Sequence, residues 1–180
     1  MEFEKTTIEG LFIIKPRIFS DERGYFYESY NKAIFEKYDL DLDFIQDNQS
    51  LSHKGVLRGL HFQAPPFAQA KLVRVIQGSV LDVAVDIRPH STTYGKYESV
   101  LLSGENKTQF LIPPGFAHGF VTLEDNTVFC YKCTGQYSKE SEGALLWNDP
   151  QININWGIDN PLVSSKDQKA QLFKNFISPF

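Results

Sequence analysis

Three charged or titratable side chains lie close together in two hydrophobic, β-prone segments of the sequence. Arg58 and His61 belong to the run 56–63, and Lys71 opens the run 71–75 after a loop with two consecutive prolines. Unpaired charges are costly to remove from water, so buried strands seldom carry this many. We therefore expect a site at which an imidazole does acid–base chemistry near neutral pH beside cations that bind an anion.

The segment 112–120 carries a second histidine in a distinctive setting. Pro113, Gly115 and His118 follow the spacing Pro-x-Gly-x-x-His. This spacing resembles the second motif of the cupin superfamily. In many cupins its histidine binds a metal together with a first motif, His-x-His followed by a glutamate.

The histidines nevertheless disfavour a metal site. His61 is followed by Gln63 where the first cupin motif has a second imidazole. His53 lies in a polar loop and His90 follows a proline in a turn, so neither is a convincing ligand. A transition metal needs enough donors that converge in tetrahedral or octahedral geometry. We therefore expect no metal.

Short blocks along nearly the whole chain resemble those of the dTDP-4-dehydrorhamnose 3,5-epimerases, a cupin-like family. In sequence order the matching blocks are FSDERGYFYE (19–28), FIQDN (44–48), RGLHFQ (58–63), KLVR (71–74), DVAVDIR (82–88), PGFAHGF (114–120), WND (147–149) and SKD (165–167). Any one block would be a weak signal, but together in this order they are specific. The resemblance implies an enzyme that inverts C3 and C5 of dTDP-4-dehydro-6-deoxy-D-glucose without a cofactor.

The residue types suit this implied reaction. A ketone at C4 acidifies the C–H bonds on both neighbouring carbons, so inversion needs a base, a cation at the developing enolate oxygen and a proton donor on the opposite face. By the resemblance, the site comprises the general base His61, the carboxylate Asp167 that orients it, the proton donor Tyr131, the cation Lys71 at the C4 oxygen, and the neighbouring Arg58 and His118. A positioned base contributes about 10²–10⁴-fold, and an enolate-stabilising donor about 10²–10³-fold.

The resemblance also implies the residues that bind the nucleotide. These are Arg23, Glu28, Gln46, Asn48, Glu142 and Lys166. Arginine suits pyrophosphate because its planar fork donates in parallel to two oxygens. Phe19 and Phe26 are candidates to stack on thymine.

Each of these residues also has an ordinary structural interpretation. His61 fits as a satisfied core histidine, Tyr131 as a packing tyrosine, and Arg23 or Lys166 as a surface charge. The functional interpretation therefore depends on the residues occurring together.

Regular alternation along a strand would place Arg58 and His61 on opposite faces, yet both are expected in one pocket. Gly59 lies between them. A glycine at this position is typical of a bulge or bend that re-aims one side chain. We therefore expect an irregular strand here.

Length and composition favour one domain, residues 1–180, with an all-β fold. The chain contains 15 Phe, 8 Tyr and 2 Trp, and its short apolar runs alternate with turn residues, as in a sandwich or barrel. We expect a cupin-like jelly roll with a few short helices. The net charge of -4 and the lack of a long Lys/Arg cluster disfavour binding to nucleic acid.

Location and partners follow from the same sequence. We recognise neither a signal peptide nor an apolar stretch of membrane-spanning length, so a cytoplasmic protein without a membrane partner is expected. The resemblance implies two partners, the dTDP-sugar substrate and a second copy of the chain. In the implied homodimer, strands of one subunit extend the sheet of the other and cover its edges.

Periodicity and turn residues predict the elements. Strands are expected at about 11–15, 25–30, 56–63, 71–77, 80–88, 97–102, 108–112, 118–123, 127–133 and 144–147. Helices are expected at 32–38 and at 166–176. The second helix would begin with a Ser165–Gln168 capping box, and its Leu172, Phe173 and Phe176 would dock on the sheet.

Two local patterns concern polar or reactive groups on strands. In the run 80–87, Asp82 and Asp86 alternate with valines, so this polar face is either solvated or lines a ligand cavity. Cys130 and Cys133 form a C-x-x-C pair, but residues three apart on a strand face opposite sides. We interpret them as two reduced packing cysteines.

Three alternative functions stay open at this point. A related epimerase would invert only C3 or only C5. A metal-dependent cupin such as a dioxygenase would hold a metal at His61 and His118. A non-catalytic cupin would bind the sugar without turning it over.

Overall fold

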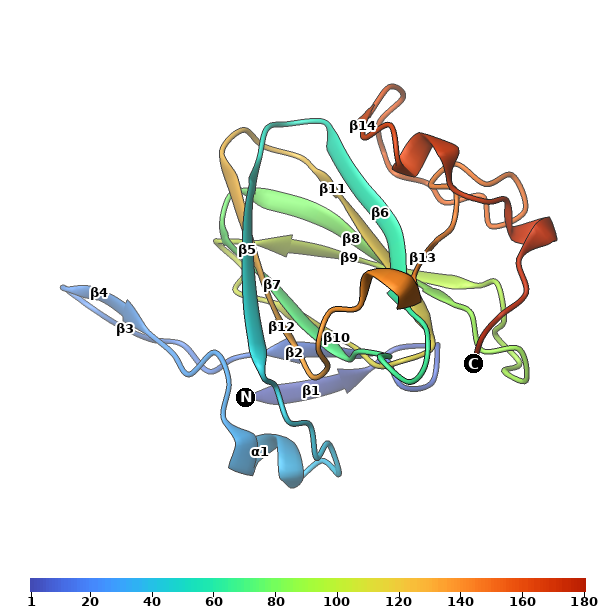
Figure 1. The fold of residues 1–180 in the computed structure, drawn as a ribbon. Helices are drawn as coiled ribbons and strands as arrows, with labels where there is room; N and C mark the ends of the chain where they lie inside the picture. Colours follow the sequence, from blue (N-terminus) through green and yellow to red (C-terminus); the bar gives the residue numbers. More distant parts are fainter.

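The computed structural model describes residues 1–180 as two antiparallel β-sheets packed face to face, with a projecting hairpin (Figure 1). The first sheet has the strand order β1-β2-β10-β7-β12-β5, and the second has the order β13-β6-β11-β8-β9. Strand β14 joins β6 in parallel, and β3 pairs with β4 in the hairpin. The expected all-β, cupin-like jelly roll is confirmed.

The elements have the following bounds. The strands are β1 Glu2–Lys5, β2 Phe12–Lys15, β3 Phe19–Asp21, β4 Gly24–Phe26, β5 Gln46–Ser52, β6 Val56–Gln63, β7 Lys71–Gln77, β8 Ser79–Asp86, β9 Tyr97–Ser103, β10 Gln109–Ile112, β11 Phe116–Thr122, β12 Thr127–Cys133, β13 Glu142–Ala144 and β14 Leu162–Val163. The α-helix α1 is Lys32–Glu36, and 3-10 turns occur at Lys139–Ser141, Asp167–Lys169 and Phe173–Asn175. No helix is long and apolar enough to cross a membrane.

The main core lies between the two sheets. Strand β7 shows why, because Val73 and Val75 point inward and are buried while Arg74 between them points away. Phe110 of β10 and Phe129 of β12 fill the same layer from the first sheet. Burying such side chains contributes roughly 1.5–3 kcal/mol each, so this layer fixes the spacing of the two walls.

The alternating strand β8 separates two cores. Val83 and Val85 pack under the C-terminal segment on the outer face of the second sheet. Asp82 and Asp86 point the other way and are both fully buried. The polar face of this strand is therefore interior, and the solvated alternative is wrong.

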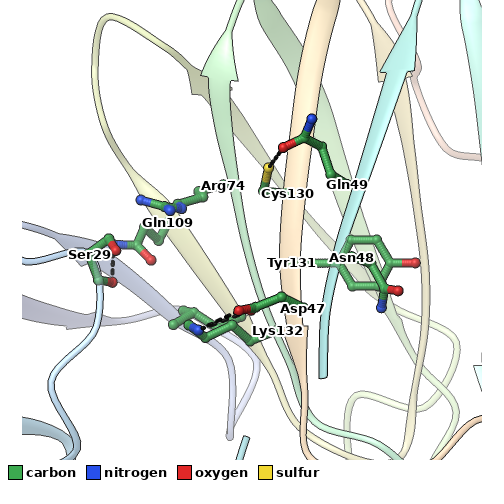
Figure 2. Close-up of a pocket in the computed structure, with 10 residues that line it drawn as sticks. Ser29, Asp47, Asn48, Gln49, Arg74, Gln109, Cys130, Tyr131 and Lys132 are labelled. Carbon is green, nitrogen blue, oxygen red and sulfur yellow. Dashed lines mark hydrogen bonds and ion pairs between the residues drawn. The ribbon is translucent and has the colours of Figure 1, made fainter. Parts of the chain in front are cut away.

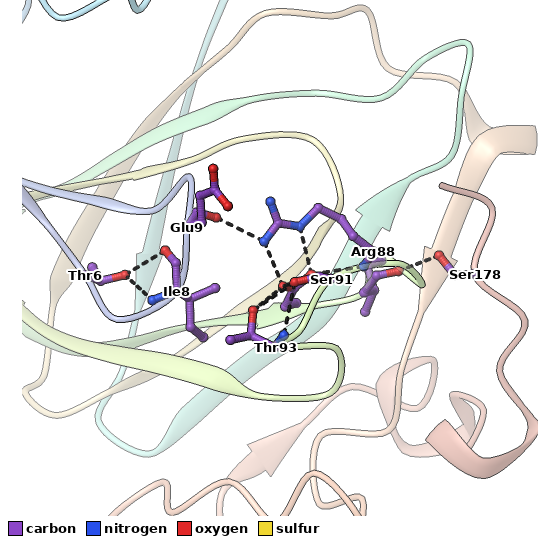
Figure 3. Close-up of polar contacts among 9 residues, drawn as sticks. Thr6, Ile8, Glu9, Arg88, Ser91, Thr93 and Ser178 are labelled. Atoms are coloured by element: carbon purple, nitrogen blue, oxygen red, sulfur yellow. Dashed lines mark hydrogen bonds and ion pairs between the residues drawn. The ribbon is translucent and has the colours of Figure 1, made fainter.

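At one end of the sandwich, the buried carboxylate of Asp86 collects polar contacts from the loop after β8. Arg88 Nη2 donates to it at 2.7 Å, and the hydroxyls of Ser91 and Thr93 donate at 2.6 Å each. Figure 3 shows Arg88, Ser91 and Thr93 converging, with Arg88 also bonded to the carbonyl of Glu9. This network ties the loop to the start of the chain.

The prediction of a helix over 166–176 is wrong. Only two 3-10 turns form there, separated by an extended stretch in which Gln171 bridges to Leu145. Leu146 N–H donates to Gln171 O at 2.9 Å, and the buried carboxylate of Asp149 accepts from Phe173 N–H at 2.8 Å. These tertiary bonds compete with helical ones, although Phe173 and its neighbour Phe176 still dock on the sheet.

Other expected elements differ in extent. The helix at 32–38 is shorter, and the strands expected at 25–30 and 144–147 are β4 and β13, which begin one or two residues earlier and end sooner. Four strands were not expected: β1, β3, β5 and β14. Both cysteines are free, with Cys133 buried on the inner face of β12 and Cys130 on the outer face.

Candidate active site

A cleft of about 640 Å³ opens between the two sheets under the C-terminal segment. An adjoining lobe of about 310 Å³ shares four lining residues with it, Asn48, His61, Lys71 and Tyr131. His61 comes from the second sheet, whereas Lys71 and Tyr131 come from the first. The expected base and proton donor therefore open into one cavity from opposite walls.

The irregular strand β6 brings Arg58 and His61 to the same cleft. The register against β11 slips there, because His118 pairs with His61 but Phe120 pairs with Arg58. Gly59 takes a φ of +135°, and a Cβ on it would lie 2.5 Å from the Cα of Gly119. Only glycine fits this close approach. The expected bulge is confirmed.

His61 is held by a carboxylate from the C-terminal segment. Its Nε2 lies 2.7 Å from Oδ1 of Asp167, which is only 3% exposed. Burial raises the pKa of Asp167, but hydrogen bonding and the charge of His61 outweigh it, and the pKa lies below its ordinary value. The backbone N–H of Asp167 in turn donates to Ser164 Oγ at 3.1 Å. An imidazole oriented by a charged carboxylate is suited to remove a proton.

On the facing wall, Lys71 and Tyr131 lie side by side, with the ammonium 6.0 Å from the ring centroid. Burial raises the pKa of the Tyr131 phenol, which keeps its proton available for donation. Burial lowers the pKa of Lys71. An ammonium in such surroundings gains strongly from an oxyanion placed beside it.

Figure 2 shows how the two faces of β12 and β5 differ. Tyr131 and its cross-strand partner Asn48 point to one side, while Cys130 and Lys132 point to the other. A polar hollow of about 280 Å³ lies on that outer side, where Lys132 pairs with Asp47 at 2.9 Å. It contains no histidine. The strand alternation thus assigns Tyr131 to the cleft.

A second histidine–carboxylate pair lies beside the first. His118 lines the cleft, and its Nε2 lies 3.0 and 2.9 Å from the two carboxylate oxygens of Asp82. Burial raises the pKa of Asp82 and lowers that of His118. Arg58, which also lines the cleft, donates from Nε to Ser52 Oγ at 3.2 Å.

Four of the six expected nucleotide-binding residues line the cleft or its adjoining lobe. They are Gln46, Asn48, Glu142 and Lys166. Lys166 Nζ pairs with Glu142 at 2.6 Å, and the hydroxyl of Tyr137 donates to Glu142 at 3.0 Å. Burial raises the pKa of Glu142, but hydrogen bonding by Lys166 and Tyr137 outweighs it and the pKa is lowered.

The other two expected nucleotide ligands are not in the cleft of this chain. Arg23 lies on the projecting β3–β4 hairpin and pairs with Asp21 at 2.5 Å. Glu28 follows the hairpin and accepts a hydrogen bond from Asn31 at 2.9 Å. The candidate stacking residues Phe19 and Phe26 lie on the same hairpin and are largely exposed.

Among the residues that sequence reasoning did not assign to the site, Asp82 and Tyr137 hydrogen-bond to predicted ones, His118 and Glu142. The alternation of Asp82 with valines indicates a polar strand face but leaves open whether that face is solvated or interior, and only the structure shows that Asp82 is buried. Tyr137, which lines the smaller lobe, stands in a loop without any pattern that distinguishes it from the other tyrosines.

The histidine, cysteine and carboxylate side chains do not form a group of three or more that could hold a metal ion. His61 and His118 each have one nitrogen engaged by a different carboxylate instead. The absence of a metal from the working site stays a prediction.

Comparisons with known proteins agree with this geometry. A model of the dTDP-4-dehydrorhamnose 3,5-epimerase family matches residues 5–175. The dTDP-4-dehydrorhamnose 3,5-epimerase of Shigella flexneri is 52% identical over 174 residues, which are 96% of each chain.

Solved structures extend the likeness to the fold. An RmlC 3,5-epimerase from Legionella pneumophila in complex with dTDP-4-keto-L-rhamnose has a TM-score of 0.94 at 48% identity, over 98% of this chain and 94% of that chain. A 3'-monoepimerase from Streptomyces bikiniensis in complex with dTDP-quinovose has a TM-score of 0.88 at 33% identity, over 93% and 85% of the two chains. By sequence and by fold, this chain belongs to the dTDP-4-dehydrorhamnose 3,5-epimerase family.

Proposed function

We propose that this protein converts dTDP-4-dehydro-6-deoxy-D-glucose to dTDP-4-dehydro-L-rhamnose by inverting C3 and C5. One observation carries the proposal: the His61–Asp167 pair and Tyr131 enter a single cleft from opposite walls, with Lys71 beside Tyr131. Inversion of a carbon next to a ketone requires this arrangement, because the proton must leave from one face and return to the other.

In the proposed reaction, His61 removes the proton from C3, and the electron pair moves into the C4 carbonyl to give an enolate. Asp167 stabilises the imidazolium that forms, as the acid does in a Ser-His-Asp triad. Lys71 stabilises the negative oxygen. Tyr131 then delivers a proton to C3 from the other face, and the same sequence at C5 completes the reaction. Between the two steps, the His61 imidazolium releases its proton to solvent and the Tyr131 phenolate takes up a proton from solvent.

The direct test is incubation with the substrate in D₂O, followed by NMR of the product. Each inverted carbon takes up one solvent deuteron, so the proposal predicts deuterium at both C3 and C5. Deuterium at one position alone would identify a single-position epimerase, the alternative favoured by the likeness to the Streptomyces bikiniensis enzyme. Exchange at neither carbon would contradict both.

Two further alternatives give different results in simple measurements. A metal-dependent cupin would be purified with near-stoichiometric iron, nickel or manganese that is lost in the variants His61→Ala and His118→Ala. A non-catalytic cupin would bind the dTDP-sugar without turnover. For the proposed epimerase, His61→Ala and Tyr131→Phe lose most of their turnover but largely keep nucleotide affinity.

A homodimer is part of the proposal, because Arg23, which the family resemblance assigns to the nucleotide site, does not line the cleft of its own chain. Arg23 is displayed on a hairpin that projects away from its own sandwich and carries Phe26, which is 67% exposed (Figure 1). Exposed aromatic side chains around an arginine are typical of an interaction surface. The hairpin of one subunit is thus suited to complete the nucleotide site of the other.

Mixing two inactive variants tests this arrangement. If Arg23 acts in the partner's site, a mixed dimer of Arg23→Ala and His61→Ala subunits contains one intact site and regains up to half of the wild-type activity per mixed dimer. If Arg23 acts within its own chain, both sites stay defective and no activity returns. The cytoplasmic location expected from the sequence stays a prediction.

A further inference from the structure

Asp82 is a buried carboxylate with a single hydrogen-bonding neighbour. It is fully buried on the inner face of β8, and its only hydrogen-bond partner is Nε2 of His118, which lies 3.0 and 2.9 Å from its two oxygens. Removing a carboxylate from water is costly, and an apolar side chain of similar size is often as stable at such a position. Packing alone therefore does not account for this residue.

The contact decides which hydrogen bonds His118 can make. Burial raises the pKa of Asp82, but the charge of Lys71 favours the ionised form, and Nε2 of His118 lies almost equally far from both oxygens, as expected for one N–H facing a carboxylate. An ionised carboxylate only accepts, so Nε2 of His118 carries the proton that lies between the two groups. Burial lowers the pKa of His118, which favours the neutral ring. In a neutral imidazole protonated at Nε2, the other nitrogen, Nδ1, has a free lone pair and can only accept.

Nδ1 of His118 is available to a ligand. It has no hydrogen-bond partner in the chain. The side-chain polar atoms that are both inaccessible to solvent and without a partner are Oε1 of Gln109 and Oγ1 of Thr122. Nδ1 of His118 is not among them, so it is accessible. His118 also lines the large cleft as the cross-strand neighbour of His61. A rigid acceptor thus faces the same space as the proposed base.

We propose that Asp82 is a positioning residue that fixes the tautomer of His118, so that Nδ1 accepts a hydrogen bond from the C2 hydroxyl of the sugar. An acceptor cannot bind the C4 ketone oxygen, which has no proton to donate. The C3 hydroxyl crosses the ring plane when its carbon inverts, whereas the C2 hydroxyl keeps its configuration throughout. The buried Asp82–His118 pair holds Nδ1 in one position, so this acceptor suits the C2 hydroxyl, whose configuration does not change during the reaction.

The inference rests on the proposed binding of a dTDP-sugar, but its test does not require turnover. Calorimetry would compare the affinities of dTDP-D-glucose and dTDP-2-deoxy-D-glucose, which differ only in the C2 hydroxyl. The wild-type protein should bind the hydroxylated sugar about 10-fold more tightly, because the 2-deoxy compound leaves the acceptor unpaired. In Asp82→Asn this ratio should fall below about threefold, because the amide can donate to Nε2 and so place the proton on Nδ1.

Asp86→Asn is the matched control, since it makes the same isosteric change on the same face of β8 but is bonded to Arg88 rather than to His118. It should keep the wild-type ratio. Equal affinities of the wild type for the two sugars, or an unchanged ratio in Asp82→Asn, would overturn the inference. If the wild type bound neither sugar, the proposed function itself would fail.

A measurement on the unaltered protein covers the case in which Asp82→Asn does not fold. The ¹⁵N chemical shifts of a histidine ring distinguish a protonated from an unprotonated nitrogen. For His118 we expect a protonated Nε2 and an unprotonated Nδ1 near neutral pH. The opposite tautomer would contradict the inference without any variant.

Discussion

Replacing Asp167 by asparagine tests how much the carboxylate behind His61 contributes. The two side chains are 2.7 Å apart at Nε2 and Oδ1. Taking about 4 Å between the charge centres and an effective dielectric constant of about 20 gives an attraction of about 4 kcal/mol for the imidazolium that forms when C3 or C5 is deprotonated. That energy corresponds to about 10³-fold in rate, since each 1.36 kcal/mol is tenfold.

The side chain of His61 is 31% exposed, so solvent screens part of this attraction. We therefore expect kcat of Asp167→Asn to fall by about 10²–10³-fold, with the affinity for dTDP unchanged. The assay is NMR of the conversion of dTDP-4-dehydro-6-deoxy-D-glucose, in parallel with calorimetric binding of dTDP.

Asp125→Asn is a suitable control because Asp125 also neighbours a histidine, His53, at 3.8 Å, but on the exposed surface. It should retain the wild-type kcat. A folded Asp167→Asn protein with kcat within twofold of the wild type would refute the role given to the carboxylate.

Three further predictions concern the opposite wall, the far end of the fold and the bulge. Tyr131→Phe should lower epimerisation about 10²–10⁴-fold while His61 still exchanges substrate protons with D₂O; unchanged turnover would argue against a proton donor here. Burial raises the pKa of Asp86, but hydrogen bonds from Arg88, Ser91 and Thr93 outweigh it and lower the pKa from 3.8 to about 2. The ionised carboxylate therefore stabilises the fold by about 2 kcal/mol above pH 4, and this stabilisation is lost as the pH falls through 2. Urea unfolding of Asp86→Asn should thus show a deficit at pH 7 that shrinks near pH 2, and a pH-independent deficit would contradict this. Gly59→Ala should lose at least about 2 kcal/mol by the same method, and more than Gly55→Ala, which has a φ of +83° and open space around it.

The parts of the fold that sequence predicted well are those with strong local patterns. Strands β6, β7 and β8 have runs of branched apolar residues, and Gly59 signalled the bulge between Arg58 and His61 because no other residue tolerates that conformation. In these places the local preference and the packing agree.

The edge strand β5 was missed because its sequence, QDNQSLS, has almost no apolar alternation. It forms because all seven residues pair with β12, which supplies the backbone partners and the apolar neighbours. Pairing with a strand about 80 residues later in the chain cannot be read from the local pattern.

The C-terminal segment shows the opposite error. A capping signal and well-placed phenylalanines predicted a helix. The segment is extended instead, because Gln171 accepts a hydrogen bond from Leu146, just after β13, and Asp149 accepts one from Phe173. Asp167 nevertheless reaches His61, because a single 3-10 turn suffices to place it.

The position of Arg23 could not be derived from sequence either. A motif identifies a residue type and its order in the chain, but not which subunit's cleft the residue enters. That Arg23 could enter another subunit's cleft becomes apparent only from the direction in which the β3–β4 hairpin projects (Figure 1).

The most direct test of the account is a crystal structure with a bound dTDP-4-keto sugar. The imidazole of His61 and the hydroxyl of Tyr131 should lie against opposite faces of the sugar ring, with Lys71 Nζ about 3 Å from the C4 oxygen. A sugar bound with both groups on the same face, or outside the cleft between the sheets, would contradict it.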